Sequence, residues 1–205
     1  MARRGASLRE HILDTAKLAF LEAGYERTSM DAIATRAETS KRSLYAHFPT
    51  KEVLFLAVVD RVDELFRGRM GTPGEYADEP VDAAALYCAR YLQMLSWESA
   101  VQTCRLGITA AVPFPEASVQ LHRALFDGPA AQLADYLGPQ LGLARDAAAA
   151  LAAELVAATV DLHVPGLLFG AIAPNTHEPD AARLADDVDV AAIRQVVQQR
   201  LPSGR

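Results

Sequence analysis

The sequence predicts an all-α protein with an N-terminal three-helix helix-turn-helix domain and a C-terminal helical bundle. Apolar residues make up 51% of the 205 residues, and alanine, the best helix former, is abundant among them. Apolar residues recur at three- and four-residue spacing, and no segment alternates between apolar and polar residues as a half-buried strand does. Clusters of Gly and Pro separate the periodic segments. These features indicate helices joined by short turns.

The first helix is predicted over about residues 8–23. Ser7 is a good N-cap, and Glu10 three residues later completes a capping box. Gly24 follows the helix and can adopt the left-handed conformation that ends helices. One apolar stripe runs along the segment: Leu8, Ile12, Ala16, Ala19, Phe20 and Ala23. Such a stripe must pack against other helices.

Two short capped helices are predicted next, followed by a longer one. Thr28 caps the second helix, Ser40 caps the third, which ends before Pro49, and the fourth covers residues 51–69. Two short helices joined by a tight turn are typical of a helix-turn-helix.

The second and third helices must cross closely in such a motif. Ala34 is small enough to stand at the crossing, and Ile33, Ala37 and Leu44 supply the apolar positions that hold the pair on the first helix. The sequence therefore predicts a compact N-terminal domain.

The rest of the chain is predicted to be a helical bundle. Residues 71–80 are rich in turn formers and read as a linker, and residues 173–187 read as a loop. The predicted helices cover residues 82–99, 101–111, 115–138, 145–172 and 188–201.

The formal net charge of −6 is divided unevenly along the chain. Residues 1–52 carry nine Lys/Arg and seven Asp/Glu, a net charge of +2, whereas residues 53–205 carry eleven and nineteen, a net charge of −8. The basic excess lies in the N-terminal quarter, so a nucleic-acid partner is expected to bind there.

The third helix begins with Ser40-Lys41-Arg42-Ser43. Two cations in a first turn are unfavourable because the helix dipole is positive there, but they suit a turn that faces phosphate. The N-terminal end of a recognition helix reaches base edges in the major groove, where Arg42 is able to pair with guanine. The alternative is a solvated surface with no partner. The predicted DNA contacts are Thr28, Ser29, Ser40, Lys41, Arg42, Ser43, Tyr45, His47 and Lys51.

Residues 8–56 resemble the DNA-binding domain of the TetR/AcrR family of repressors. The resemblance rests on Ile12-Leu13-Asp14-Thr15-Ala16, Phe20, Ala23-Gly24-Tyr25, Thr28-Ser29-Met30-Asp31-Ala32-Ile33-Ala34, Ser40-Lys41 and Leu44-Tyr45-Ala46-His47-Phe48-Pro49-Thr50-Lys51-Glu52. It implies a homodimeric transcription regulator that binds a palindromic operator in double-stranded DNA. It also implies a helix-turn-helix domain over residues 1–52, a ligand-binding and dimerisation domain over residues 53–205, and helix 51–69 as their connection.

The turn between the second and third helices departs from the family pattern. The family usually has glycine and then valine where this chain has Glu38 and Thr39. Glycine serves a position that favours positive φ, so a glutamate there is expected to cost about 1 kcal/mol. It also adds a negative charge near DNA.

The family resemblance implies that an effector binds among the helices after the linker. Pockets for small molecules are mostly apolar with a few polar groups, which indicates a small apolar or aromatic ligand. The alternative for each aromatic residue is a plain core position, and for His163 a hydrogen-bonded core histidine. The predicted ligand contacts are Tyr87, Tyr91, Met94, Trp97, Phe114, Phe126 and His163.

The last two predicted helices are expected to form the dimer interface. The helix over residues 147–172 is apolar nearly all round, and the helix over residues 188–201 is apolar on one face, so both need covering. In a two-fold dimer the recognition helices would stand about 35 Å apart, to suit consecutive major grooves.

Several other classes of protein are not expected. No N-terminal segment has the pattern of a signal peptide, the longest apolar stretch carries two carboxylates, against a membrane span, and Cys88 and Cys104 are expected to be reduced core thiols. A cytoplasmic protein is therefore expected. No catalytic, cofactor or metal motif is found, so no enzyme is expected. The alternatives left open are an activator, a regulator without ligand, and a helical small-molecule enzyme or carrier.

Overall fold

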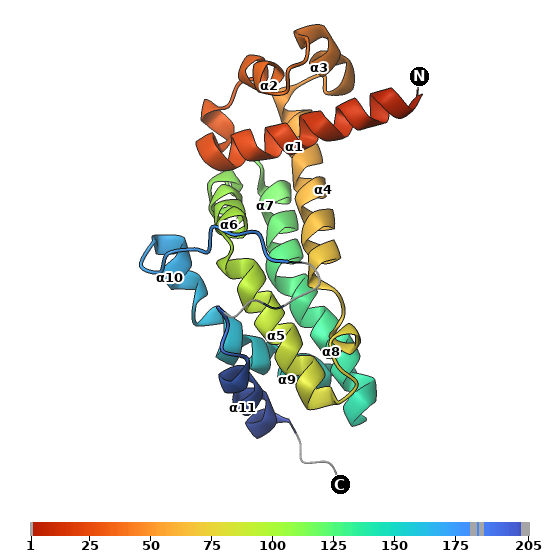
Figure 1. Ribbon diagram of the computed structural model, residues 1–205, viewed down its shortest axis with the longest axis vertical. Coiled ribbons are helices and arrows are strands. Elements are labelled where there is room, and N and C mark those ends of the chain that lie inside the picture. Colours follow the sequence, from red (N-terminus) through yellow and green to blue (C-terminus); the bar gives the residue numbers. More distant parts are fainter. Residues whose placement is uncertain (1, 181–183, 185–186, 202–205) are drawn as a thin grey trace. The chain divides into compact units, whose positions relative to one another are not determined.

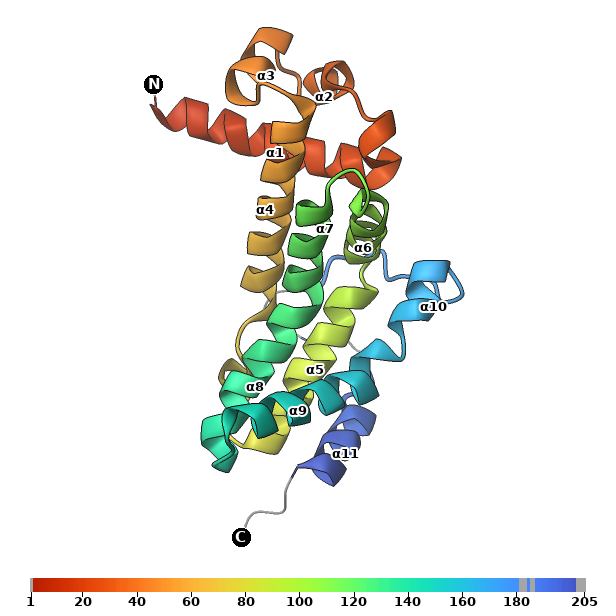
Figure 2. The same ribbon diagram turned by 180° about the vertical axis from the view of Figure 1, so that it is seen from behind.

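The computed structural model describes residues 2–180, 184 and 187–201. Over these residues the chain is helical (Figures 1 and 2), apart from an isolated parallel bridge between Trp97 and Asn175. The α-helices are α1 (Ala2–Arg27), α2 (Met30–Arg36), α3 (Lys41–His47), α4 (Lys51–Met70), α5 (Pro80–Ser96), α6 (Glu98–Ala110), α7 (Pro115–His122), α8 (Gly128–Leu141), α9 (Arg145–Val156), α10 (Val164–Phe169) and α11 (Val190–Arg200). The predicted all-α class is confirmed.

Three short helices of other types complete the fold. The 3₁₀ helix η1 (Pro73–Glu75) lies in the predicted linker, and the π-helices η2 (Arg123–Asp127) and η3 (Ala157–Asp161) follow α7 and α9. The two segments predicted as single helices over residues 115–138 and 145–172 therefore each contain a π-helical turn. A π-turn widens the helix by one residue and has no periodic signal in the sequence.

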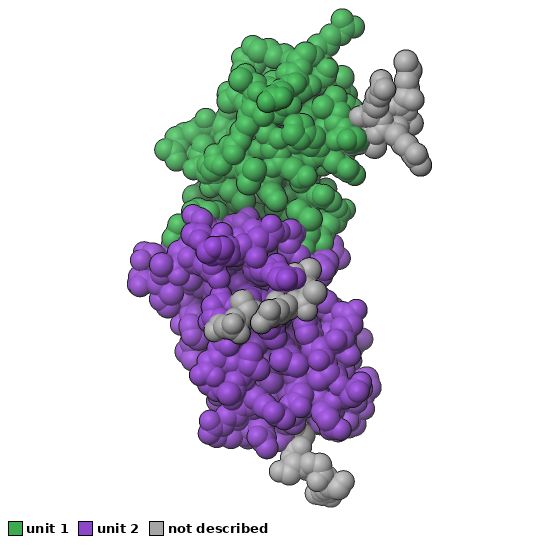
Figure 3. All heavy atoms as spheres, viewed as in Figure 1, with its two compact units in different colours: residues 1–65, 102–122 green, residues 66–101, 123–205 purple. Residues whose placement is uncertain are grey.

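The chain divides into two compact units that differ from the predicted domains (Figure 3). Unit 1 comprises residues 1–65 and 102–122, and unit 2 comprises residues 66–101 and 123–205. Most of α6 and all of α7 thus belong with the helix-turn-helix. The reason is packing, because Leu106, Ala110, Ala117 and Leu121 are buried in the same hydrophobic core as α1 to α4.

The core of unit 1 is built on the apolar stripe of α1. Ile12, Ala16 and Phe20 are fully buried. Gly24 has a φ of 78° and interrupts the helix where its end was predicted. The beginning differs from the prediction, since α1 begins at Ala2 and Ser7 lies inside it.

An aromatic cluster joins three segments of unit 1. The ring centroid of Phe114 lies 4.5 Å from that of Tyr25 and 5.3 Å from that of Phe55, and the last two are 5.1 Å apart. Edge-to-face pairs of this kind stabilise packing beyond the area they bury. The turn between α6 and α7 is thereby held against α1 and α4.

Unit 2 is organised around α5. This helix packs against α8, η3 and α11 within the unit (Figure 2), and its alanines allow close approach. Arg90 is buried and donates hydrogen bonds to the carbonyl oxygens of Arg69 (3.1 Å) and Asp180 (2.6 Å). These hydrogen bonds offset part of the cost of burying the guanidinium, and they tie the segment after α10 to α5.

Both cysteines are expected to be chemically inert in the folded protein. Cys88 and Cys104 are buried free thiols, and burial raises the pKa of Cys88 to about 11 and that of Cys104 to about 12. The thiolate is the reactive form, and a raised pKa leaves little of it at neutral pH. A disulfide reagent should therefore label neither thiol in the native protein and both in denaturant. Rapid labelling of the native chain would contradict this burial.

Candidate functional site

The helix-turn-helix is formed by α2 and α3 in unit 1. Ser40 caps α3, because its Oγ accepts a hydrogen bond from the amide of Ser43 at 3.1 Å. The N-cap of α2 is Ser29 and not Thr28, since the Oγ of Ser29 accepts from the amide of Ala32 at 3.1 Å. As predicted, the residues that hold the two helices together are buried: Ile33, Ala34, Ala37 and Leu44.

The turn between these helices has the backbone strain that the sequence indicates. Glu38 has a φ of 48°, the one positive φ of a non-glycine residue in the described chain. Its amide donates to the carbonyl of Thr35 at 3.1 Å, and the amide of Thr39 donates to that of Ala34 at 3.0 Å. The turn therefore keeps its hydrogen bonds despite the missing glycine.

Replacing Glu38 with glycine is expected to stabilise the protein. Glu38→Gly relieves the left-handed strain and should raise the free energy of unfolding by about 1 kcal/mol in a denaturant titration. Glu38→Gln is the matched control, because it removes the charge and keeps the Cβ, and its effect should stay within about 0.5 kcal/mol. Equal stabilisation by both variants would assign the cost to charge and not to the backbone.

The exposed face of α3 presents cationic and hydroxyl groups. Lys41 is 65% exposed and forms an ion pair with Asp31 at 2.6 Å. Arg42 is exposed beside it, and Tyr45 is 45% exposed one turn further along. His47 is half-buried, with its ring tilted against that of Phe48. The predicted contact residues Lys41, Arg42 and Tyr45 therefore lie on one accessible helix.

Two predicted phosphate contacts are engaged within the protein. Thr28 is buried, and its Oγ1 lies 2.7 Å from the carbonyl oxygen of Gly24. The ammonium of Lys51 donates to the carbonyl oxygens of Tyr25 and Thr28, at 3.0 Å and 3.1 Å, and lies 4.2 Å from the centroid of the Tyr25 ring. Both side chains thus bind carbonyl oxygens at or just beyond the C-terminal end of α1, a role that the sequence analysis missed.

Three of the predicted ligand contacts belong to the core of unit 2. Tyr87, Tyr91 and Met94 are at most 1% exposed. The hydroxyl of Tyr87 lies 3.0 Å from the carbonyl oxygen of Pro129, and that of Tyr91 lies 2.7 Å from the carbonyl oxygen of Leu125. Burial raises the pKa of Tyr87. These tyrosines therefore join α5 to the segment at η2 and α8.

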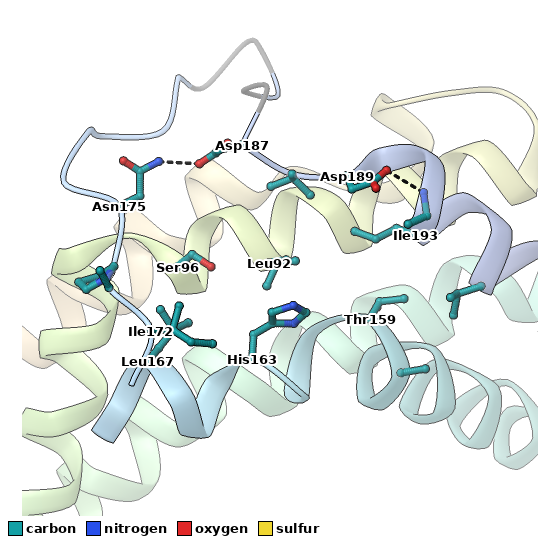
Figure 4. A pocket seen from close by; sticks show the side chains of 16 residues that line it. Leu92, Ser96, Thr159, His163, Leu167, Ile172, Asn175, Asp187, Asp189 and Ile193 are labelled. Atoms are coloured by element: carbon teal, nitrogen blue, oxygen red, sulfur yellow. Dashed lines mark hydrogen bonds between the residues drawn. The ribbon is translucent and has the colours of Figure 1, made fainter. Parts of the chain in front are cut away.

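The other three predicted aromatic contacts are dispersed. Phe114 lies in the aromatic cluster of unit 1. Trp97 is half-buried and has the guanidinium of Arg69 at 5.6 Å from its ring centroid, and Phe126 is half-buried in η2. None of these aromatic residues is among the described residues that line the cavity of unit 2 shown in Figure 4.

A cavity of about 750 Å³ lies elsewhere in unit 2 (Figure 4). His163, one of the predicted ligand contacts, is among the residues that line it. The remaining walls come from α5, η3, α10, the segment that follows it, and the beginning of α11. The lining residues missed by sequence reasoning include Leu92, Ser96, Ile172, Asn175, Asp187 and Ile193.

Two further properties bear on the kind of site. Among the described residues, no group of three or more His, Cys, Asp or Glu side chains could hold a metal ion. No helix in the described ranges combines the length and apolar character needed to cross a membrane.

Comparison with known proteins places the helix-turn-helix in a family. Residues 12–58 match the family model of bacterial regulatory proteins, tetR family. The chain is 44% identical over 72 residues to the HTH-type transcriptional activator FasR of Mycolicibacterium smegmatis. These residues cover 32% of this chain and 33% of that protein. It is 43% identical over 54 residues to the HTH-type transcriptional regulator QacR of Staphylococcus aureus, and these residues cover 26% of this chain and 29% of that protein. The chain thus spans a third or less of these relatives.

Solved structures extend the similarity over nearly the whole chain. A TetR-family transcriptional regulator from Mesorhizobium loti has a TM-score of 0.75 and 25% identity, over 97% of this chain and 96% of that chain. The flavonoid-responsive regulator FrrA has the same fold, with a TM-score of 0.65, 23% identity and coverage of 94% and 92%. The matched motif and the shared architecture lead to one assignment: residues 12–58 carry the DNA-binding motif of the tetR family of bacterial regulatory proteins, and the chain has the fold of a TetR-family regulator.

Proposed function

We propose that this protein is a transcriptional repressor that binds a palindromic DNA operator as a homodimer and is released from it by a small apolar or aromatic molecule. The observation that carries the proposal is the exposed face of α3. Ser40 caps this helix and Leu44 anchors it in the core, while Lys41, Arg42 and Tyr45 face solvent. A recognition helix needs this combination of a rigid base and accessible donors at its N-terminal end.

DNA binding also explains the arrangement of charge in α2 and α3. The ion pair between Lys41 and Asp31 is exposed, so it contributes little to stability. A phosphate that approaches Lys41 competes with the Asp31 carboxylate for the ammonium. Arg42 remains available for a base edge, where guanine accepts two hydrogen bonds.

The homodimer is supported by exposed apolar side chains in unit 2. Leu162, two residues before α10, is 74% exposed, and Phe169, the last residue of α10, is 90% exposed. Large apolar groups close together on a surface mark an interaction site. In the proposed dimer a second copy covers them. Light scattering at micromolar concentration should give the mass of two chains, and a helical monomer would refute the dimer.

The effector acts in this proposal by preferring one state of the protein. The effector occupies unit 2, and α6 begins in that unit and continues into unit 1, where Phe114 in the turn after α6 contacts Tyr25. A ligand shifts such an equilibrium only as far as its affinity differs between the two states. Release therefore requires tighter binding to the form that does not hold DNA.

The test is a fluorescence-anisotropy titration against the DNA immediately upstream of the protein's own gene. The expected result is saturable binding with a nanomolar dissociation constant and with two protein chains, or a multiple of two, per site. Random DNA should not displace the bound protein. The affinity should fall steeply with salt, because phosphate contacts release counterions. Affinity equal to that for random DNA would contradict an operator at this site.

The direction of regulation needs a separate measurement, since one relative of the helix-turn-helix is an activator. In bacterial cells, a reporter gene placed downstream of the bound DNA should be expressed less when the protein is present. Higher expression would favour an activator, with the same DNA contacts.

A further inference from the structure

The cavity in unit 2 has an apolar floor and one acidic side. Its volume of about 750 Å³ is within the range of small-molecule sites. Figure 4 shows His163 on one side, and Asn175 with Asp187 on the other. The apolar lining residues are Leu92, Ala158, Leu167, Ile172, Ala173, Pro174, Val188, Ala192, Ile193 and Val196.

Two carboxylates supply the charge of the cavity. One oxygen of Asp187 accepts a hydrogen bond from the side-chain amide of Asn175 at 2.5 Å, and the other accepts from that of Gln93 at 3.5 Å. Asp189 accepts from the backbone amide of Ala192 at 2.9 Å, as the N-cap of α11. All of these donors are neutral. In the described part of the chain no Lys or Arg lines the cavity, and His163, on the opposite side from Asp187, is the one basic side chain among the lining residues.

The walls are held in place by contacts of their own. Asn175 is fixed to the end of α5, because its amide donates to the carbonyl of Ser96 at 2.7 Å and its carbonyl accepts from the amide of Glu98 at 2.8 Å. Ile172 lies directly on Gly166, where a Cβ would stand 2.6 Å from the Ile172 Cδ1 atom. The acidic side is therefore positioned before any ligand binds, which lowers the cost of binding.

We propose that this cavity binds an apolar molecule that carries a positive charge, with the cation beside Asp187 and the apolar body against Leu92, Ile172 and Ile193. A cation gains from a carboxylate whose hydrogen-bond donors in the described chain, Asn175 and Gln93, are neutral, and because Asp187 is exposed this gain should fall as salt is added. An anion of the same shape would be repelled. The assignment of this molecule as the effector rests on the proposed function, whereas its binding does not.

The experiment uses two ions of the same shape and opposite charge. Tetraphenylphosphonium and tetraphenylborate are titrated into the full-length protein without DNA, by calorimetry and by the fluorescence of Trp97, the single tryptophan of the chain. Trp97 forms the backbone bridge with Asn175 and so reports on this wall. The cation should bind once per chain, and the anion should bind at least about tenfold more weakly.

Substitution of one carboxylate locates the site. Asp187→Asn keeps the size of the side chain and should weaken tetraphenylphosphonium binding about tenfold. Asp146→Asn makes the same change of charge at an exposed position in α9, outside the cavity lining, and should leave the affinity within about twofold. Circular dichroism of both variants checks that they fold.

Equal binding of the two ions, or unchanged cation binding in Asp187→Asn, would overturn the inference. So would cation binding that appears only as the dimer dissociates, because the cavity would then be covered by the second copy. Anisotropy with operator DNA separates the two proposals. Cation binding that depends on Asp187 but does not release DNA would support this inference and remove the effector role.

Discussion

Operator affinity is expected to fall about 100-fold when Lys41 and Arg42 are both replaced by alanine. Both residues are exposed in the first turn of α3, and in the proposed complex Arg42 reads a base while Lys41 neutralises a phosphate. Each of the two lost contacts, one with a base and one with a phosphate, costs no more than about 1–3 kcal/mol of binding free energy. The slope of affinity against salt should also become shallower, since each lost phosphate contact removes about 0.9 from it.

The matched control removes two cations from unit 2. Arg123 and Arg145 are exposed there, and their double alanine variant has the same net charge as the α3 variant. It should bind operator within about threefold of the unchanged protein, because distant exposed charges are screened. A similar loss in both variants would mean that only overall charge matters and would remove Lys41 and Arg42 from the contact surface.

The helix-turn-helix was predictable because its determinants are local. The cap at Ser40, the small residue Ala34 and the apolar Leu44 each act within a few residues of their place in the sequence. The strained turn at Glu38 was also visible, since only one or two residues determine it. What sequence could not supply was the orientation of Lys51, whose three carbonyl partners lie more than twenty residues away.

The cavity of unit 2 was largely missed because the residues that line it have no common period. Helical periodicity predicts that Tyr87 and Tyr91 face inward, which is correct, but it does not distinguish a filled core from a cavity. Their hydroxyl partners, at Pro129 and Leu125, are supplied by segments far along the chain. The acidic side comes from a segment that reads as a loop, where Asp187 has no periodic signal.

Phe114→Ala is expected to lower the free energy of unfolding by about 3 kcal/mol, measured by denaturant titration. Its ring contacts those of Tyr25 and Phe55, and alanine leaves a cavity between α1 and α4. Val112→Ala is the control, because Val112 lies in the same turn and is 92% exposed. Its effect should stay within about 0.5 kcal/mol. Equal stability of the two variants would mean that the aromatic cluster does not hold this turn.

The same substitution tests how effector binding in unit 2 lowers the affinity of unit 1 for DNA. The proposed release requires that a change in α6 and α7 moves α1, and Phe114 is the large, half-buried side chain of the connecting turn that packs against the core of unit 1. At a temperature where the Phe114→Ala variant is folded, it should therefore keep its affinity for the operator, while the effector should weaken that affinity less than in the unchanged protein. Coupling between two sites is a free energy of about 1–3 kcal/mol, so the loss of one well-packed ring is large enough to remove most of it. Retained coupling would require a route through α4, which also runs from unit 1 into unit 2.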